Sequence, residues 1–485
     1  MQFNSFIFIL VFMPLTLIFY FWANKINCLF GKILLIIAGI VFYIYADIKT
    51  GFVLGFSLVV NFCSAKVIEQ AGKKKHCFRW LCFFPVLVNI LLLVYFKYTN
   101  FLIVNINEIF SSDFALQKVM LPIGISFYTF QQIAYVVSVY KREIQKVDWV
   151  DYLLYILYFP KLLMGPLMEP VDFLKQINDN TRKKVNWNNL ACGIQILCFG
   201  LFKKMMIADI FEKAVSWGYS NMETTTSMDW LLIMVFYTFE IYFDFSGYSD
   251  MAVGSSLMLN ITLPINFDSP YKALSIKEFW KRWHISLTGF FTKYIYIPLG
   301  GNRKGKKITY MNIMLVFLIS GIWHGANWTF ILWGVLHGIF MVLDRVFEKI
   351  ESKKFKPVRW GSTFLIVNVL WLLFRSDSIK QWAGILKIIG TVSKTGISAG
   401  LVNQFILPES TFLASIFHLV FWKEHAGKVG MLLFIIGAGG ICLLPENNYN
   451  NLKKISMLSM ILSVISFIWA FICLSGESVF VYFNF

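Results

Sequence analysis

Two histidines stand beside tryptophans in this apolar chain, one of them within a more polar stretch. His324 lies in "SGIWHGANW" (residues 320–328) and His284 in "SIKEFWKRWHISL" (275–287). An imidazole titrates near neutral pH and therefore suits general acid–base chemistry. Ionisable groups at membrane depth are costly and usually belong to a site or a pathway. Two plainer interpretations stay open: His324 as a packing histidine bonded to a backbone carbonyl, and His284 as part of an amphipathic interfacial helix.

The residues around His324 are small. Gly321, Gly325 and Ala326 are expected to let another molecule approach the imidazole ring. His337 follows His324 by 13 positions, and the chain is expected to turn at Asn327. These two histidines are therefore predicted to face different directions and not to share a site.

Carboxylates also occur inside an apolar helix. In "FEIYFDFSGYSDMAVG", Glu240 and Asp244 stand one turn apart. Carboxylates in such surroundings need partners, so we expect structural ion pairs and not catalysis. The expected partners are Lys203, Lys204 and Arg282. Arg282 should also pair with Glu278, which precedes it by four positions on one helix face.

The stretch "IPLGGNRKGKK" (297–307) is a glycine-rich basic loop. Its backbone N–H groups and cations could hold the phosphates of a donor such as a coenzyme A thioester. It lacks the GxxxxGK[ST] pattern of a P-loop. A solvated cytoplasmic loop is the alternative.

The composition indicates an integral membrane protein. Of 485 residues, 58% are hydrophobic and 15% are charged, whereas soluble domains carry about 25% charged residues. The apolar residues form blocks of about 20, the length needed to cross a bilayer. The net charge of +17 comes from short basic loops such as "NDNTRKKVNW", which are typical of the cytoplasmic side of a membrane and require no nucleic-acid partner.

The pattern predicts an all-α polytopic membrane protein with about 11 transmembrane helices. Four spans begin near residues 4, 30, 52 and 80. The others lie near 187–208, 229–247, 311–325, 328–347, 361–375, 429–444 and 456–475. Residues 119–140 and 152–170 contain prolines and polar residues, so they are expected to form re-entrant helices around a central tunnel. The polar stretch 264–308 should form amphipathic interfacial helices.

Several segments together resemble the membrane-bound O-acyltransferase family, in particular its bacterial alginate O-acetylation-like subgroup. The N-terminal part of the resemblance is carried by "LPIGISFYTFQQIAYVVSVYK", "FPKLLMGPLMEPVDF" and "GLFKKMMIAD". The remainder is carried by "YFDFSGYSDMAVG", "WHISLTGFFTKYIYIPLGGNRKGK", "GIWHGANWTFILWGVLHG" and "LWLLFRSDS". The resemblance covers about residues 119–380 and implies one membrane-embedded acyltransferase domain. Its parts would be N-terminal spans (1–118), a catalytic core (119–380) and C-terminal surface helices and spans (381–485).

The resemblance implies an O-acetyltransferase in which His324 is the catalytic base and His284 the second catalytic residue. Cytoplasmic acetyl-CoA would be the donor substrate, with no permanently bound cofactor and no metal. The residues expected to bind donor or substrate are Arg303, Lys304, Lys306, Lys307, Trp323 and Asn327. Those expected to brace the site are Glu240, Asp244 and Arg282.

Similar systems reside in the bacterial cytoplasmic membrane, among its lipids, and work with an extracytoplasmic serine-hydrolase-like acetyltransferase on a surface or extracellular polysaccharide. The chain has no GxSxG or GDS motif, so such a step would need a separate partner protein. One departure stands out. Thr292 and Lys293 occupy the place where many relatives have Arg-Asp, so contacts near the cytoplasmic mouth are expected to differ.

Two alternatives belong to other activities. D-alanyl transfer to teichoic acid would use a carrier-protein thioester, although the "IPLGG" loop and the chain length argue against it. A non-enzymatic transporter would also explain broken helices and buried charges.

Overall fold

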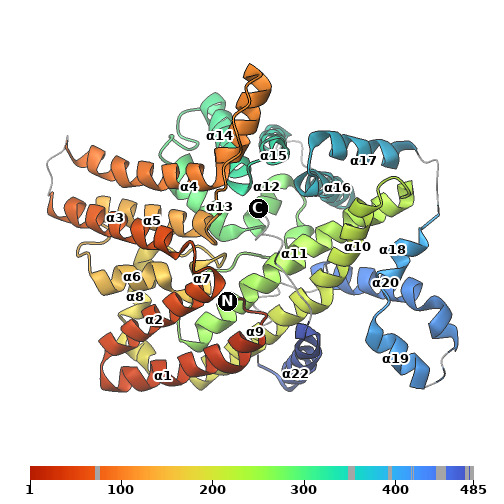
Figure 1. The fold of residues 1–485 in the computed structure, drawn as a ribbon, viewed down its shortest axis with the longest axis horizontal. Coiled ribbons are helices and arrows are strands. Elements are labelled where there is room, and N and C mark those ends of the chain that lie inside the picture. Colours follow the sequence, from red (N-terminus) through yellow and green to blue (C-terminus); the bar gives the residue numbers. More distant parts are fainter. Residues whose placement is uncertain are drawn as a thin grey trace. The chain divides into compact units, whose positions relative to one another are not determined.

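The computed structural model describes residues 1–71, 77–347, 355–391, 396–416, 418, 420–443, 455–475 and 480. Within these ranges the chain is helical, and an isolated β-bridge joins Phe267 and Trp283. The predicted all-α class is therefore confirmed. The contacts divide the chain into two compact units, each of which combines non-contiguous segments (Figure 1).

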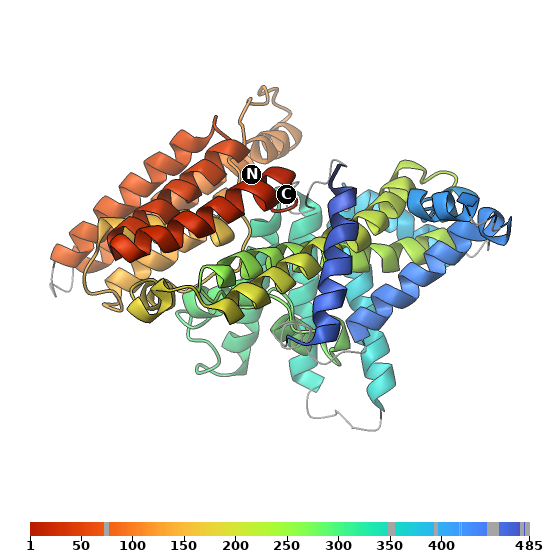
Figure 2. The ribbon, with the colours of Figure 1, turned by 90° about the horizontal axis from the view of Figure 1, so that it is seen from below.

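The first unit comprises residues 1–199, 248–265 and 452–463. Its red and orange helices run roughly alongside one another (Figure 2). Its elements are η1 (Phe8–Phe12), α1 (Met13–Ile26), α2 (Cys28–Ala46), α3 (Gly51–Gln70), α4 (Cys77–Phe110), α5 (Ile125–Tyr140), α6 (Trp149–Leu157), α7 (Phe159–Leu162), α8 (Pro170–Ile177), η2 (Asn180–Lys183) and most of α9 (Trp187–Phe202).

The second unit comprises residues 200–247, 266–451 and 464–485. Its first elements are η3 (Lys203–Ala208), α10 (Asp209–Ser220), most of α11 (Ser227–Met258), η4 (Pro270–Lys272), α12 (Ile276–Arg282), α13 (Ile285–Phe291) and η5 (Thr292–Tyr296). They are followed by α14 (Lys306–His324), α15 (Trp328–Phe347), α16 (Lys356–Arg375), α17 (Ile379–Thr391), α18 (Ala399–Asn403), α19 (Pro408–Ile416), α20 (Val420–Leu443), part of α22 (Met457–Ile472) and η8 (Cys473–Ser475).

Nine helices among the described residues are long and apolar enough to cross a membrane. They correspond to nine of the spans predicted from the sequence. The other two predicted spans differ in kind. Residues 229–247 lie inside α11, a long helix whose acidic residues make it less apolar than the nine. Residues 456–475 contain α22, which is apolar but has only 16 residues.

Of the two segments predicted to be irregular, the second is broken. Helix α5 begins after Gly124 and is continuous, whereas α6 ends at Leu157 and is separated from α7 by Tyr158. The polar residues of these segments bind one another. The buried Lys161 ammonium donates to Gln131 Oε1 at 2.5 Å and to the carbonyl of Tyr155, while Gln131 Nε2 donates back to the carbonyl of Lys161 at 3.0 Å.

A neutral polar network joins α3, α4 and α5. Ser57 Oγ and Asn61 Nδ2 donate to Gln132 Oε1 at 2.5 and 2.9 Å, and Asn89 Nδ2 donates to Asn61 Oδ1 at 2.7 Å. In lipid the hydrophobic effect does not drive helices together, whereas hydrogen bonds between helices do stabilise their association. The network therefore fixes how these three helices pack.

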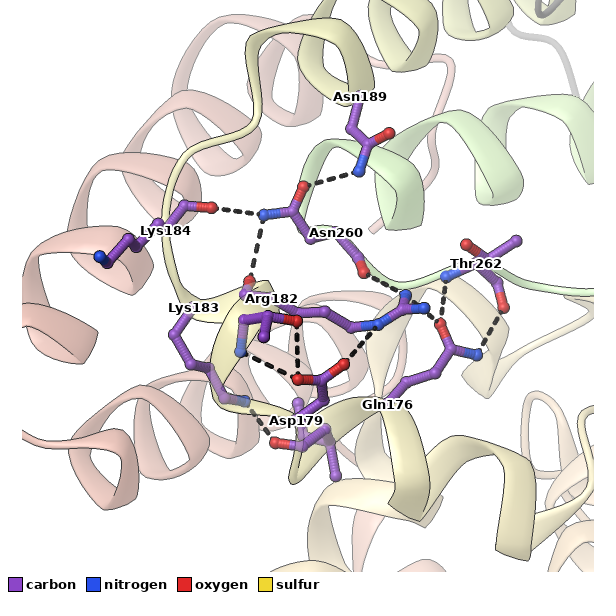
Figure 3. Close-up of polar contacts among 10 residues, drawn as sticks. Gln176, Asp179, Arg182, Lys183, Lys184, Asn189, Asn260 and Thr262 are labelled. Carbon is purple, nitrogen blue, oxygen red and sulfur yellow. Dashed lines mark hydrogen bonds and ion pairs between the residues drawn. The ribbon is translucent and has the colours of Figure 1, made fainter.

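The basic loop "NDNTRKKVNW" is fastened to the chain that follows α11 (Figure 3). Asn260 Nδ2 donates to the carbonyls of Arg182 and Lys184 at 3.1 and 2.7 Å. In return, Arg182 Nη1 donates to the carbonyl of Asn260 at 3.0 Å and to Gln176 Oε1 at 2.7 Å. Asn260 has a left-handed backbone (φ 62°), which asparagine tolerates better than most residues. The loop is therefore an ordered part of the first unit.

Helices α14 and α15 pack closely through glycines. A Cβ atom added to Gly334 would lie 2.4 Å from the carbonyl oxygen of Phe317, and one added to Gly321 would lie 2.4 Å from that of Phe330. Such small residues let membrane helices approach one another closely. The contact brings the α15 side chains into reach of the last turn of α14.

We expect Gly334→Val to separate α14 from α15, because the added methyl groups would overlap backbone atoms that cannot rotate away. Overpacking of this kind typically costs 1–3 kcal/mol of unfolding free energy. Thermal unfolding of the purified protein in detergent would measure the loss. Gly361→Val in α16 is the matched control, because an added Cβ there meets no atom within 4 Å. Equal stability of the two variants would contradict the assigned packing.

Candidate active site

His324 is the last residue of α14 and is 4% exposed. Its imidazole is surrounded by aromatic rings. The ring centroids of Trp323, Trp333 and Phe374 lie 4.9, 5.1 and 5.3 Å from that of His324. Rings from α14, α15 and α16 thus limit how this imidazole can move.

His284 lies between α12 and α13 with a left-handed backbone (φ 46°, ψ 50°). This conformation is uncommon for a residue with a Cβ and persists only where its surroundings impose it. The neighbouring backbone does so: Asp268 N–H donates to the carbonyl of Arg282 at 2.9 Å, and Ile285 N–H donates to the carbonyl of Asn266 at 3.0 Å. The strained position aims the imidazole into the interior, where it is 1% exposed.

Trp323 lies near both histidines. The ring centroid of Trp323 lies 6.4 Å from that of His284 and 4.9 Å from that of His324. Phe245 of α11 contacts His284 at 4.7 Å. Burial lowers the pKa of His284 to about 3, because the charged form loses its hydration. The ring of His284 is therefore neutral at pH 7 and able both to donate and to accept a hydrogen bond.

A third histidine belongs to the same aromatic cluster. His337 is fully buried, and its ring centroid lies 4.7 Å from that of Trp333, which also contacts His324. Trp280 Nε1 donates to His337 Nδ1 at 3.2 Å. The chain turns at Asn327 as expected, and the turn folds α15 back along α14, so that His324 and His337 both contact Trp333. Only the pairing of Gly321 with Gly334, which no sequence period reveals, could have indicated this. That the two histidines do not share a site stays a prediction.

The small residues beside His324 serve the protein's own packing. The backbone of α15 occupies the space beside Gly321, and the ring of Phe330 lies where a Cβ of Gly325 would be. Asn327 is similarly occupied. Its Oδ1 accepts from Thr329 N–H at 3.0 Å at the start of α15, and its Nδ2 donates to the carbonyl of Asp377 at 2.9 Å.

The buried acidic and basic residues of the second unit form ion pairs that join different helices. Lys204 Nζ lies 2.6 Å from Asp244 Oδ1 and 2.9 Å from Asp209 Oδ1, so the expected pairing of Asp244 with Lys204 is present. Glu240 is buried and interacts electrostatically with Arg375 at the end of α16.

Arg282 forms the expected pair with Glu278 at 2.9 Å. Its Nη1 also donates to the carbonyl of Asp268 at 3.0 Å. Arg282 therefore braces the strained segment that carries His284. It is not found in contact with Glu240 or Asp244, which lie one turn apart in α11 and interact electrostatically with each other.

The basic loop lies at the other end of α14. Arg303 and Lys304 are exposed just before the helix, and Lys306 and Lys307 are exposed in its first turn. Because α14 rises about 1.5 Å per residue, its first and last residues lie about 27 Å apart along the axis. The structure therefore does not bring these cations to His324.

The residues that depart from the usual Arg-Asp pair begin the π-helical segment η5. Thr292 Oγ1 donates to the carbonyl of Thr288 at 2.7 Å, and the Lys293 ammonium lies 5.4 Å from the ring centroid of Tyr294.

Fold and site together define a multi-pass helical membrane protein with buried histidines suited to acid–base chemistry. The model of the membrane-bound O-acyltransferase family matches residues 40–376. The chain belongs to this family, and the predicted O-acyltransferase class is confirmed. The membership speaks against the transporter alternative.

The curated relatives are O-acetyltransferases for the most part. A peptidoglycan O-acetyltransferase of Helicobacter pylori is 36% identical over an alignment of 525 residues, which spans all of this chain and 97% of the relative. The probable alginate O-acetylase AlgI of Pseudomonas aeruginosa is 36% identical over 78% of this chain and 73% of its own length. A teichoic acid D-alanyltransferase of Bacillus subtilis is 29% identical and covers 50% of this chain and 65% of its own length.

The π-helical segment η3 places Lys204 opposite α11. Gly247 allows the close approach, because a Cβ there would lie 2.8 Å from the carbonyl oxygen of Gly200. Lys204 and Asp244 are each about 2% exposed, so their charges are poorly screened by water.

We expect Lys204→Met to destabilise the protein by about 3–5 kcal/mol, because a buried charge pair loses one partner. Equilibrium unfolding in detergent with added denaturant would measure the change. Lys66→Gln is the comparison, since Lys66 and Glu69 form a more exposed pair of the kind worth about 0–1 kcal/mol. A Lys204→Met variant as stable as Lys66→Gln would show that the pair contributes nothing.

Proposed function

We propose that this protein is an O-acetyltransferase that uses acetyl-CoA to acetylate a cell-surface polysaccharide, with peptidoglycan as the favoured acceptor. The observation that carries the proposal is the pair of buried imidazoles, His284 and His324, whose rings both lie within 6.4 Å of the ring of Trp323. A transferase needs a base for the acceptor hydroxyl and a donor for the developing oxyanion. Two histidines in one apolar site supply both.

In the proposed reaction, His324 accepts the proton of the acceptor hydroxyl while that oxygen attacks the thioester carbonyl carbon. The carbonyl oxygen becomes an oxyanion, to which the neutral ring of His284 donates a hydrogen bond. Collapse of the tetrahedral intermediate re-forms the carbonyl and breaks the carbon–sulfur bond. The proton held by His324 passes to the sulfur, so the products are an ester and a free thiol.

The donor side follows from the position of the charges. Arg303, Lys304, Lys306 and Lys307 are exposed cations that suit the phosphates of coenzyme A. A neutral, extended arm would then carry the thioester along α14 to His324, through the tunnel that the sequence predicts. Trp323, which lies near both imidazoles, would contact the acetyl group.

The acceptor side rests on the relatives. The Helicobacter pylori peptidoglycan O-acetyltransferase aligns with the whole of this chain, whereas the probable alginate O-acetylases align with about 78% of it. We propose that the chain acts as one acyltransferase domain in the bacterial cytoplasmic membrane. We further propose that it passes the acetyl group to a serine-hydrolase-like partner outside the cell, which completes transfer to the glycan.

We expect His324→Ala to lower the acetylation rate about 10²- to 10⁴-fold, the contribution of a positioned general base. The measurement is alkali-labile acetate on purified peptidoglycan from cells with matched membrane levels of the protein. His418→Ala, which changes an exposed histidine, should leave the acetate unchanged. Normal acetate in the His324→Ala strain, with loss in a deletion strain, would refute the assignment of His324 as the base.

His284→Leu should lower kcat about 10²- to 10³-fold, as removal of an oxyanion donor does. It should not move the acid limb of the pH–rate profile. Because burial lowers the pKa of His284 to about 3, its ring stays neutral throughout the range from pH 5 to pH 8 and does not titrate there. A shift in the midpoint of the acid limb in this variant would show that His284 changes its charge during the reaction.

A further inference from the structure

An apolar hollow of about 400 Å³ lies in the second unit, and the described residues that line it do not include His284, His324 or His337. Its walls come from the end of α9, the start of α19, α20 and α22. Phe405 and Ala438 form a buried floor, 1% and 2% exposed, while Leu433 and Trp469 at its edge are 57% and 37% exposed. The hollow is therefore closed at its base and open at its edge.

The glycines of α20 divide into two kinds. A Cβ added to Gly427 or Gly430 would lie 2.7 or 2.5 Å from the carbonyl oxygens of Val402 and Phe405, so these two positions let the helix pack closely. Gly437 also lines the hollow, but an added Cβ there meets no atom within 4 Å. Helix packing does not require a glycine at position 437, and its effect is to keep the hollow open.

The surroundings of the hollow are hydrocarbon. Residues 425–443 of α20 and the helical run 187–220 are both apolar and long enough to cross a membrane. Buried water needs two to four polar partners, and the side chains that line the hollow are apolar apart from Glu409. An apolar space that faces lipid tails is thus suited to hydrocarbon and not to water.

The charge at the edge of the hollow selects among hydrocarbon ligands. Among the described residues that line the hollow Glu409 is the charged one, and the thiol of Cys473 donates to its Oε1 at 3.8 Å. A carboxylate repels the carboxylate of a free fatty acid and the phosphates of an acyl-CoA. A chain esterified to glycerol carries no charge at that position. We propose that this hollow is a binding site for one acyl chain of a membrane phospholipid.

The test uses the full-length protein in nanodiscs whose phosphatidylcholine carries a diazirine in its acyl chain. After irradiation and digestion, mass spectrometry should find the label on the α20 and α22 peptides that contain Leu433 and Trp469. Gly437→Leu should remove most of this label, because its Cβ meets no atom within 4 Å and the rest of its side chain would extend into the hollow. Gly361→Leu in α16, another glycine with no atom within 4 Å of an added Cβ, should leave the label unchanged.

A competition experiment tests the charge argument. Excess palmitate should not displace the phospholipid label from the unmodified protein, whereas in Glu409→Gln palmitate should displace it. Displacement in the unmodified protein would show that the site takes free fatty acids and would overturn the proposal. Labelling that is equal in Gly437→Leu and unmodified protein would also overturn it, since it would reflect only the general contact of these helices with lipid.

Discussion

The close approach of α14 and α15 is the constraint on which the candidate site depends. Gly321 and Gly334 each face a carbonyl oxygen of the opposite helix at a distance that leaves no room for a side chain. At this spacing, Trp333 contacts both His324 and His337. Wider spacing would break these ring contacts. The imidazole of the proposed base is therefore positioned mainly by packing.

Electrostatic contacts position the parts that packing does not. The strained backbone at His284 is held by the pairing of 266–268 with 282–285, and Arg282 strengthens that pairing through Asp268 and Glu278. Lys204 joins η3 to α11 through Asp244, next to Phe245, which contacts His284. The Lys204–Asp244 pair is about 2% exposed, and in such surroundings of low dielectric its attraction is stronger than in water. Each charge thus secures one element of the site.

The sequence predicted what depends on local composition. Apolar runs predicted the nine spans, and prolines predicted the break in the helices of residues 152–170. The pair of Arg282 with Glu278 follows from helical spacing, and that of Asp244 with Lys204 from the need of a buried carboxylate for a partner. The sequence could not predict what depends on contacts between distant segments. The glycines beside His324 appeared to leave room for a ligand, whereas Phe330 and the α15 backbone fill that space. His337 appeared remote for the same reason, because a sequence does not state how closely two antiparallel helices pack. Donor binding by the basic loop and support of the site by Glu240, Asp244 and Arg282 remain predictions.

The length of α14 has a consequence for which acyl donors the protein can use under the proposed mechanism. The exposed cations precede its first turn, and the histidine ends its last turn, about 27 Å along the axis. A donor held by its phosphates at that loop reaches His324 only if a long uncharged linker separates phosphate from acyl carbon. Coenzyme A has such a linker. In acetyl phosphate the charge adjoins the acyl carbon, so its anion would have to enter the apolar site itself. The length of α14 therefore selects against this donor.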